Sequence, residues 1–213
     1  VHALTNVHYN AYRGKVNVLM GENGAGKSTL MRVLAGVISS DAGEILIDGQ
    51  PVQIGKPQDA KAAGVAMVYQ ELNLIRRVSV AENVFLGRYP MKHGFVQWNQ
   101  MNQAAKALFD SFGIEMDVNQ QLRSLSLAQQ QIVEIIKAVS INAKVVIMDE
   151  PTSSLTSRET EVLFRIIQSL RERGVAVIFI THRLDEIYAI CDRMTILRDG
   201  CYIGTRDVKD IIK

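Results

Sequence analysis

The stretch that decides the fold is Gly21-Glu22-Asn23-Gly24-Ala25-Gly26-Lys27-Ser28, which Thr29 follows. It satisfies G-x-x-x-x-G-K-[ST] and stands between an apolar run at 17–20 and a helix-forming segment, the context that this motif requires. Its glycines let backbone N–H groups converge on phosphate oxygens at the positive N-terminus of a helix. Lys27 neutralises the β- and γ-phosphates, and Ser28 ligates Mg²⁺. The motif predicts a Mg²⁺-dependent nucleoside triphosphate site along 21–29.

Four short apolar runs predict the central strands of a sheet. They cover residues 17–20, 65–68, 145–148 and 175–180. None alternates between polar and apolar residues, which is typical of parallel strands covered on both faces. Amphipathic stretches separate the runs. The sequence therefore predicts an α/β fold with a P-loop core, a mainly parallel sheet and helices on both faces.

Two Asp-Gly pairs predict antiparallel hairpins. Asp48-Gly49 follows a short apolar run at 45–47, and Asp199-Gly200 follows one at 195–197. Asp-Gly favours the two-residue type I′ turn, so we expect an antiparallel edge on the parallel sheet.

Two capping boxes mark helix starts, Ser79 with Glu82 and Thr156 with Glu159. After Thr156, apolar residues recur at helical spacing until Gly174, which suits the left-handed position after a helix. Between 86 and 125 the polarity rises, and residues 99–112 predict a helix that does not belong to the alternation of strands and helices. We expect one nucleotide-binding domain over 1–213 that contains a small helical subdomain at about 87–140.

The composition indicates an ordinary globular chain without a strongly charged partner. Lys plus Arg is 24 and Asp plus Glu is 22, a net charge of +2, which argues against a nucleic-acid arm or a polybasic membrane anchor. Cys191 and Cys201 are too few for a disulfide framework, so both are expected to be buried, inert thiols in a reducing compartment.

No apolar run is long enough to span a bilayer. The first residues, from Val1, contain neither a starting Met nor a leader peptide, so we expect a segment of a longer chain.

Polar residues follow three of the predicted strands at the edge where ligands of α/β proteins bind. Asp149 and Glu150 end the run at 145–148; Asp149 is expected to hold Mg²⁺ directly or through water, and Glu150 to accept a proton from the attacking water. His182 follows the run at 175–180 and is expected to contact the γ-phosphate and orient the nucleophile. Gln70 lies just after the run at 65–68 and is weak evidence when taken alone.

Taken together, the motifs at these strand ends resemble those of the ATP-binding-cassette (ABC) ATPase family, and the resemblance covers nearly the whole chain. Gln70 matches the family's Q-loop, Asp149 and Glu150 its Walker B pair, and His182 its switch histidine. The resemblance implies ATP and Mg²⁺ as cofactors. It also implies that Gln70 ligates Mg²⁺ and takes part in catalysis beside Glu150 and His182.

The segment Leu125-Ser126-Leu127-Ala128-Gln129 occupies the place of the family's LSGGQ signature but departs from it. Leu127 and Ala128 replace glycines, so close approach of this backbone to a partner's γ-phosphate is expected to be impaired. The resemblance implies that Ser126 and Gln129 bind the nucleotide. The same two residues also form a capping box, and we expect both roles at once.

The family branch is indicated by Gln70 to Leu74, by Leu86 to Pro90 and by 151–156, where the usual D-loop Asp is absent. These stretches resemble the monosaccharide importers, including those for galactosides and ribose, in which one polypeptide carries two cassettes. The resemblance implies the N-terminal cassette of such a chain, lying at the cytoplasmic face of the inner membrane. Its partners would be the second cassette or a second copy, a sugar permease and, indirectly, a sugar-binding protein; no nucleic acid is implied.

Two alternatives remain open. One is a soluble ABC-type ATPase acting on nucleic acid or the ribosome; the near-neutral charge and the short spacing from Ser28 to Ser126, without room for a coiled-coil insertion, argue against it. The other is a nucleotide-sensing module without turnover, which the presence of Glu150 and His182 disfavours.

Overall fold

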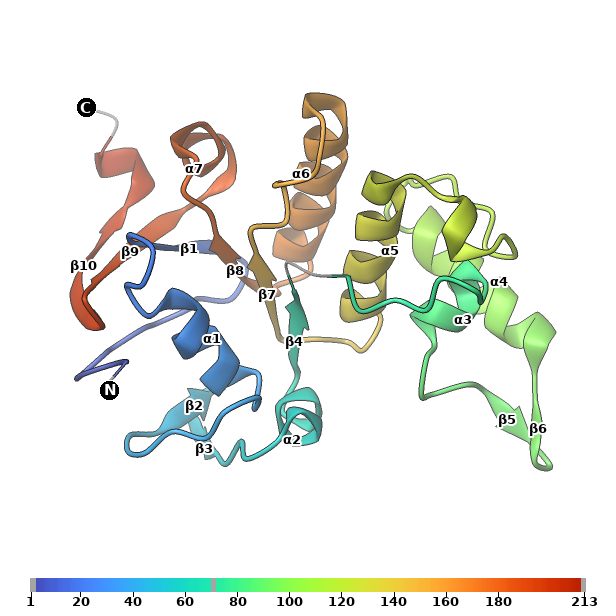
Figure 1. Cartoon of the computed structure of the whole chain (residues 1–213), viewed down its shortest axis with the longest axis horizontal. Helices are drawn as coiled ribbons and strands as arrows, with labels where there is room; N and C mark the ends of the chain where they lie inside the picture. Colours follow the sequence, from blue (N-terminus) through green and yellow to red (C-terminus); the bar gives the residue numbers. More distant parts are fainter. Residues whose placement is uncertain (1–2, 70–71, 212–213) are drawn as a thin grey trace.

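The computed structural model describes residues 3–69 and 72–211 and contains a six-stranded sheet at its centre (Figure 1). Neighbouring strands are parallel except at one edge, where the last two are antiparallel. The strand order is β10 (Cys201–Asp207), β9 (Arg193–Arg198), β1 (Val16–Met20), β8 (Ala176–Ile180), β7 (Val145–Asp149) and β4 (Val65–Val68). The predicted mainly parallel sheet with an antiparallel edge is confirmed.

Both Asp-Gly turns are confirmed as well. Asp199 and Gly200 have φ values of 49° and 73° between β9 and β10, and Asp48 and Gly49 have φ values of 55° and 76°. These left-handed values suit the type I′ turn. The second hairpin, β2 (Ile45–Ile47) with β3 (Gln50–Val52), forms a separate two-stranded sheet beside the main one.

Helices cover both faces of the main sheet, which explains the uninterrupted apolar strands. In β8, Val177 and Phe179 belong to the core shared with α6 (Ser157–Glu172), whereas Ile178 and Ile180 belong to the core shared with α1 (Lys27–Leu34). Successive side chains of a strand point to opposite faces, so each face receives its own helices. The remaining helices near the sheet are α2 (Pro57–Ala62) and α7 (Leu184–Ile190).

The predicted capping boxes lie at the starts of α3 (Val80–Val84) and α6. Gly174, two residues after the end of α6, has a φ of 77°, as the sequence predicted. A third capping box, Ser126 with Gln129, begins α5 (Leu127–Val139).

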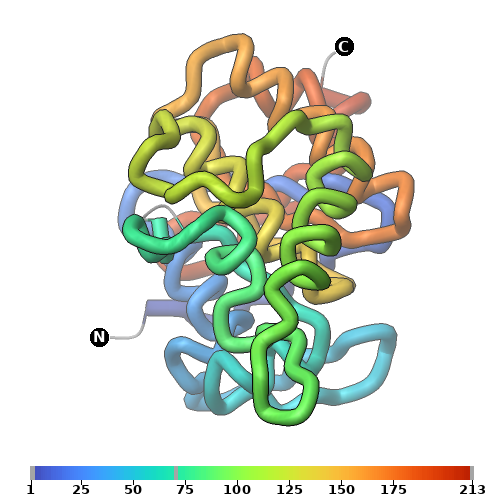
Figure 2. Tube along the Cα trace, turned by 90° about the vertical axis from the view of Figure 1, so that its right-hand side faces the viewer, coloured from blue at the N-terminus to red at the C-terminus, as the bar shows by residue number. Residues whose placement is uncertain are grey.

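A cluster of helices lies beside the sheet, formed by α3, α4 (Trp98–Asp110) and α5 (Figures 1 and 2). A short hairpin, β5 (Met91–Lys92) with β6 (Phe95–Val96), projects from it. The short 3₁₀ helices are Leu122–Ser124 and Val208–Asp210. The cluster includes α3, which precedes residue 87, and the subdomain boundary of 87–140 stays a prediction.

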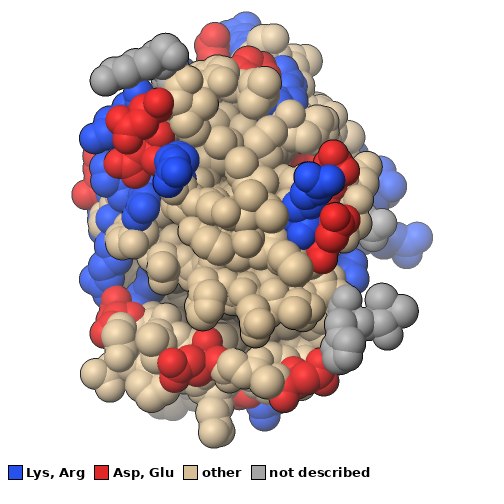
Figure 3. All heavy atoms as spheres, turned by 90° about the vertical axis from the view of Figure 1, so that its left-hand side faces the viewer, with Lys and Arg blue, Asp and Glu red and all other residues tan. Residues whose placement is uncertain are grey.

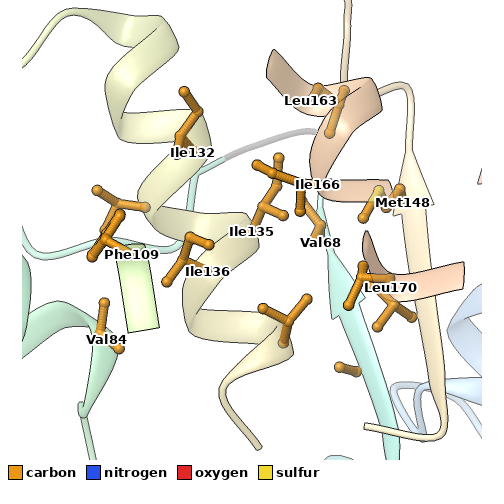
Figure 4. Close-up of a cluster of buried hydrophobic side chains, with 14 of the residues drawn as sticks. Val68, Val84, Phe109, Ile132, Ile135, Ile136, Met148, Leu163, Ile166 and Leu170 are labelled. Atoms are coloured by element: carbon orange, nitrogen blue, oxygen red, sulfur yellow. The ribbon is translucent and has the colours of Figure 1, made fainter. Parts of the chain in front are cut away.

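Helix α5 joins this cluster to the sheet. In Figure 4, Ile135 lies beside Ile166 of α6 and Val68 of β4, while Ile136 lies toward Phe109 of α4. All five side chains are almost fully buried. Because α5 is held from both sides, the position of its N-terminus at Ser126 is set by the core.

The two cysteines differ in environment, and the expectation of a buried thiol is wrong for Cys201. Cys191 is partly buried, and burial raises the pKa of its thiol to about 12. Cys201 is exposed because it begins β10, an edge strand whose first residues face solvent. Both are free thiols. Among the described helices, none combines the length and apolar character that crossing a membrane requires.

The face on the side of β10 shows no large patch of one charge sign. In Figure 3, Lys and Arg lie next to Asp and Glu around a broad area of other residues. This mixture agrees with the small net charge of +2.

Candidate nucleotide-binding site

The predicted phosphate-binding loop connects the end of β1 to the start of α1. Gly24 and Gly26 have φ values of 87° and 94°, a region that glycine adopts at little cost. A Cβ atom on Gly26 would lie 2.6 Å from Leu4 Cδ2, and one on Gly21 would lie 2.3 Å from the Leu197 carbonyl oxygen. Close packing therefore requires glycine at position 21, backbone conformation favours it at position 24, and both conditions apply at position 26.

Gly26 is the N-cap residue of α1 and supplies no side-chain hydrogen bond to the helix. The N-terminal N–H groups of α1 are thus not capped by a side chain and can bind an anion. Lys27, the first residue of α1, donates from Nζ to the carbonyl oxygens of Gly21 at 2.6 Å and Glu22 at 2.9 Å. This ammonium group stands beside the loop that the phosphates would enter.

A cleft of about 720 Å³ opens at this loop and brings most of the predicted site together. Its lining consists of Ala3, Gly21, Glu22, Asn23, Gly24, Ala25, Gly26, Lys27, Ser28, Thr29, Asp149, Glu150, Ile180 and His182. One cleft therefore lies at the ends of β1, β7 and β8, which carry the phosphate-binding loop, the acidic pair and the histidine.

Asp149 is the last residue of β7 and is half-buried. Burial raises the pKa of its carboxyl group, and the nearby charge of Glu150 raises it further, while Lys27 and Arg32 act in the opposite direction. The two cations therefore do not offset the effects of burial and of Glu150 on the charged carboxylate. A bound cation would stabilise that charged form.

Glu150 has a left-handed φ of 46°, which is uncommon for a residue with a side chain. Its backbone N–H donates to the Ile180 carbonyl oxygen at 3.0 Å. The turn of the chain here directs Glu150 toward the end of β8, and its Oε1 atom lies 3.2 Å from Nδ1 of His182.

The His182 side chain is 73% exposed, whereas that of Glu150 is 28% exposed. A carboxylate accepts this hydrogen bond when the imidazole carries a proton on Nδ1, and Nε2 is then the ring nitrogen left available to a ligand. The pair joins a partly buried carboxylate to an exposed imidazole, and both line the cleft.

The residues on either side of His182 are tied to a buried carboxylate. Thr181 donates from Oγ1 to Glu186 Oε2 at 2.7 Å, and the Arg183 backbone N–H donates to Thr181 Oγ1 at 3.1 Å. Arg183 Nε also lies 3.2 Å from Glu186 Oε1, and Glu186 of α7 is 2% exposed. This network holds the backbone from which His182 projects.

The residues present fit a magnesium ion that is shared with a nucleotide. The Ser28 hydroxyl and the Asp149 carboxylate line the same cleft, and oxygen atoms are the ligands that Mg²⁺ prefers. The described residues hold no group of three or more His, Cys, Asp or Glu suited to bind a metal by themselves. Phosphate oxygens and water would therefore complete the coordination.

Two predicted residues are not part of this cleft, and the position of a third relative to it is not described. Ser126 and Gln129 lie at the N-terminus of α5, where Ser126 Oγ accepts from the Gln129 N–H at 3.2 Å and Gln129 Oε1 accepts from the Ser126 N–H at 3.0 Å. Between them, Leu127 is exposed and Ala128 is buried. The third, Gln70, lies outside the described residues, so its assignment to catalysis and Mg²⁺ stays a prediction.

Sequence reasoning missed two residues of the lining. Ile180 ends a predicted strand and could have been assigned from that position alone. Ala3 had no signal, because it reaches the cleft through tertiary pairing: the Thr5 N–H donates to the Gly200 carbonyl oxygen at 2.8 Å and brings the N-terminal segment to the loop.

Comparison with known proteins shows the family to which the chain belongs. A family model described as "ABC transporter" matches residues 4–153. The ribose import ATP-binding protein of Chromobacterium violaceum is 48% identical over 209 residues, which cover 98% of this chain and 42% of that protein. The galactose/methyl galactoside import ATP-binding protein of Haemophilus influenzae is 50% identical over 210 residues, covering 99% and 42%. The chain thus spans less than half the length of these curated relatives.

Among solved structures, a dimeric ATP-binding cassette in a post-hydrolysis state bound to ADP and Pi superposes with a TM-score of 0.81. It is 26% identical, and the match covers 97% of this chain and 90% of the other.

Proposed function

Because the chain belongs to the ABC transporter family, we propose that it is the ATP-binding and hydrolysing cassette of a monosaccharide importer of the ribose or galactose type. The observation that carries the proposal is the single cleft shared by the phosphate-binding loop, Asp149, Glu150 and His182. The relatives that match over nearly the whole chain support the sugar class.

In this proposal the β- and γ-phosphates of ATP lie at the uncapped N-terminus of α1, where Lys27 moves from the loop carbonyls to the phosphates. Bound Mg²⁺ would neutralise phosphate charge between Ser28 and Asp149. Glu150 accepts a proton from the attacking water. His182 keeps this carboxylate oriented through Nδ1–H, and in the imidazolium form its Nε2–H donates to the γ-phosphate.

The second part of each site would come from another cassette. Ser126 and Gln129 are exposed and absent from the cleft of their own chain, so a head-to-tail arrangement would let them reach a partner's nucleotide. The partner is a second cassette in the same longer polypeptide or a second copy of this chain. The dimeric cassette structure and the greater length of the relatives support this arrangement.

This head-to-tail arrangement can be tested by mixing two inactive variants. Lys27→Ala disables the phosphate side, and Ser126→Asp retains a good N-cap while placing a negative charge toward the incoming phosphate. Equal amounts of both variants should regain turnover that neither has alone, because each mixed pair contains one intact composite site. Ser79→Asp, at the capping box of α3, is the matched control and should remain active unmixed. Absence of regained activity would contradict the shared site.

The permease would bind near the start of the helical cluster. A cleft of about 180 Å³ lies between α2, β4, α3 and α5, and Lys137 of its lining donates from Nζ to the Asn73 carbonyl oxygen at 2.6 Å, which ties the segment 72–77 to it. In a transporter assembled at the cytoplasmic face of the membrane, Leu74→Asp or Ile75→Asp should reduce sugar uptake more than ATP turnover. The solute itself would be selected by the permease and a sugar-binding protein.

Affinity purification from detergent extracts separates this function from a role on nucleic acid or the ribosome. Recovery of an integral-membrane sugar permease supports the importer. Recovery of ribosomes or nucleic acid without a permease would contradict it.

A further inference from the structure

The β5–β6 hairpin is a feature that nucleotide binding does not use. Its two-residue loop is His93-Gly94, with φ values of 51° and 83°, and Lys92 pairs with Phe95 across it. Figures 1 and 2 both show it projecting at the free end of the helical cluster, below α4. Leu86 and Arg88, just before the hairpin, line the smaller cleft beside α2 and β4.

Large apolar side chains are exposed on this hairpin and directly after it. Phe95 is 75% exposed, Met91 is 58% exposed and Trp98 is 51% exposed. Tyr89 lies beside Trp98, with ring centroids 6.2 Å apart. Exposed apolar groups gathered in this way mark interaction surfaces rather than ordinary solvent-facing positions.

The apolar groups occupy both faces of the hairpin. Residues opposite each other across two antiparallel strands share a face, so Met91 with Val96 forms one face and Lys92 with Phe95 forms the other. A protein groove covers one face of such a ribbon. The apolar layer beneath lipid headgroups surrounds both faces of an inserted tip.

The charged residues of the segment 83–109, which contains the hairpin, have one sign. No Asp or Glu occurs from 83 to 109, whereas Lys92 stands exposed at the tip beside His93. Arg88 at the base is turned inward, where it donates to the carbonyl oxygens of Val84 and Ser140. Aromatic rings together with an exposed lysine, on a segment that itself contains no carboxylate, are suited to an anionic headgroup region.

We propose that the β5–β6 hairpin contacts the surface of a bilayer containing anionic phospholipid, with Phe95, Met91 and Trp98 among the upper acyl chains and Lys92 at the phosphates. The proposal rests on the importer function in that a permease would hold the cassette next to a membrane. A contact of this size is weak by itself and adds to the permease contact, as interfacial anchors commonly act in pairs.

Trp98 makes the contact directly measurable, since it is the only tryptophan of the chain. We expect its fluorescence emission to shift to the blue when the 213-residue chain is titrated with vesicles of phosphatidylglycerol and phosphatidylcholine in equal parts. Vesicles of phosphatidylcholine alone should give a much smaller shift, and added salt should weaken the response.

Two variants test the parts of the surface. Phe95→Ser should weaken vesicle binding about tenfold, because it removes an inserting ring. Lys92→Gln should weaken binding to the anionic vesicles about fivefold, because it removes one cation near the phosphates. Leu46→Ser is the control, since Leu46 is 52% exposed on the other hairpin, two residues before Asp48. It should bind as the unchanged chain does.

An unchanged Trp98 emission with anionic vesicles overturns the proposal, as does equal loss of binding in Phe95→Ser and Leu46→Ser. If Phe95→Ser lowers sugar uptake in the assembled transporter while the unchanged chain ignores vesicles, the hairpin contacts the permease and the lipid contact is wrong. Regained ATP turnover in the mixing experiment is independent of both results, so failure of the lipid contact leaves the proposed function standing.

Discussion

The N-termini of α1 and α5 offer a direct comparison, because the sequence assigned both to nucleotide binding. At α1 the N-cap is Gly26, which gives no side-chain hydrogen bond, and the helix end opens into the cleft. At α5 the N-cap is Ser126, whose hydroxyl and N–H are already bonded to Gln129. An uncapped helix end keeps donors available for a phosphate, whereas a capping box satisfies two of them.

The difference teaches that the residues proposed to bind the phosphates and the metal and to act as the base share one cleft in a single chain. The signature segment lies outside this cleft, and its capping hydrogen bonds are already formed. Under the proposed head-to-tail arrangement, full activity requires a second cassette to approach Ser126. The predictions below test the two helix ends and the acidic edge between them.

The largest effect is expected at Glu150. Glu150→Gln keeps the shape and polarity of the side chain but cannot accept a proton, so turnover should fall about 10²–10⁴-fold. The affinity for Mg²⁺-ATP should be nearly unchanged. Single-turnover hydrolysis and equilibrium nucleotide binding measure the two quantities, and turnover equal to that of the unchanged chain would remove the general-base role.

Lys27→Ala should act on binding instead. Loss of charge-assisted hydrogen bonds to the phosphates should weaken ATP affinity about 10–100-fold. Titration with a fluorescent ATP analogue measures this effect. Arg32→Ala is a useful control because Arg32 is an exposed cation of the same helix outside the lining of the cleft. Similar losses in both variants would point to general electrostatics rather than to the loop.

A dilution series tests whether a second chain must supply Ser126 from the N-terminus of α5. If a second copy must supply Ser126, turnover per chain should fall about tenfold for each tenfold dilution in the range where monomers predominate. Rates at saturating Mg²⁺-ATP over a wide dilution series measure this dependence. A fast rate that stays constant on dilution would show that a single chain carries the complete site.

A smaller effect is expected on stability at Asp149. Its raised pKa means that the folded chain binds the proton more tightly than the unfolded chain, so stability falls as pH rises through the raised pKa. Asp149→Asn should therefore raise Tm by a few degrees at neutral pH without nucleotide, and by less in acid. It should also lose the added stability that Mg²⁺-ATP provides. Thermal unfolding at two pH values measures both, and destabilisation at neutral pH would contradict the burial argument.

The smallest effect is expected at a cap remote from the cleft. Ser79→Ala removes the side-chain acceptor for the Glu82 N–H at the start of α3 and should cost about 0.5–2 kcal/mol of stability. ATP affinity should not change. Denaturant unfolding and nucleotide binding measure the two, and a parallel loss of affinity would mean that α3 communicates with the cleft.

Local patterns predicted much of the fold and of the site. The strands at 65–68 and 145–148, the two Asp-Gly turns and the capping boxes depend on neighbours within a few residues, so their sequence signals are strong. Helix α4 was placed within two residues at each end. The motif from Gly21 to Thr29 likewise predicts a phosphate-binding loop from its local sequence alone.

The sequence contained no comparable signal for contacts between segments that are distant along the chain. Ala3 enters the cleft through pairing with the turn at Gly200, and Glu186 supports His182 from a separate helix. Cys201 is exposed because of its place at a sheet edge, which depends on strand order.

The sequence by itself determined the α/β class, the phosphate-binding loop and the identities of Asp149, Glu150 and His182, because these follow from short-range patterns and from where strands end. Only the tertiary structure decided that those residues share one cleft, that Ser126 lies outside it and that the β5–β6 hairpin stands free. The physical reason is that strand order and helix packing minimise exposed apolar surface over the whole chain, and no short segment contains that information.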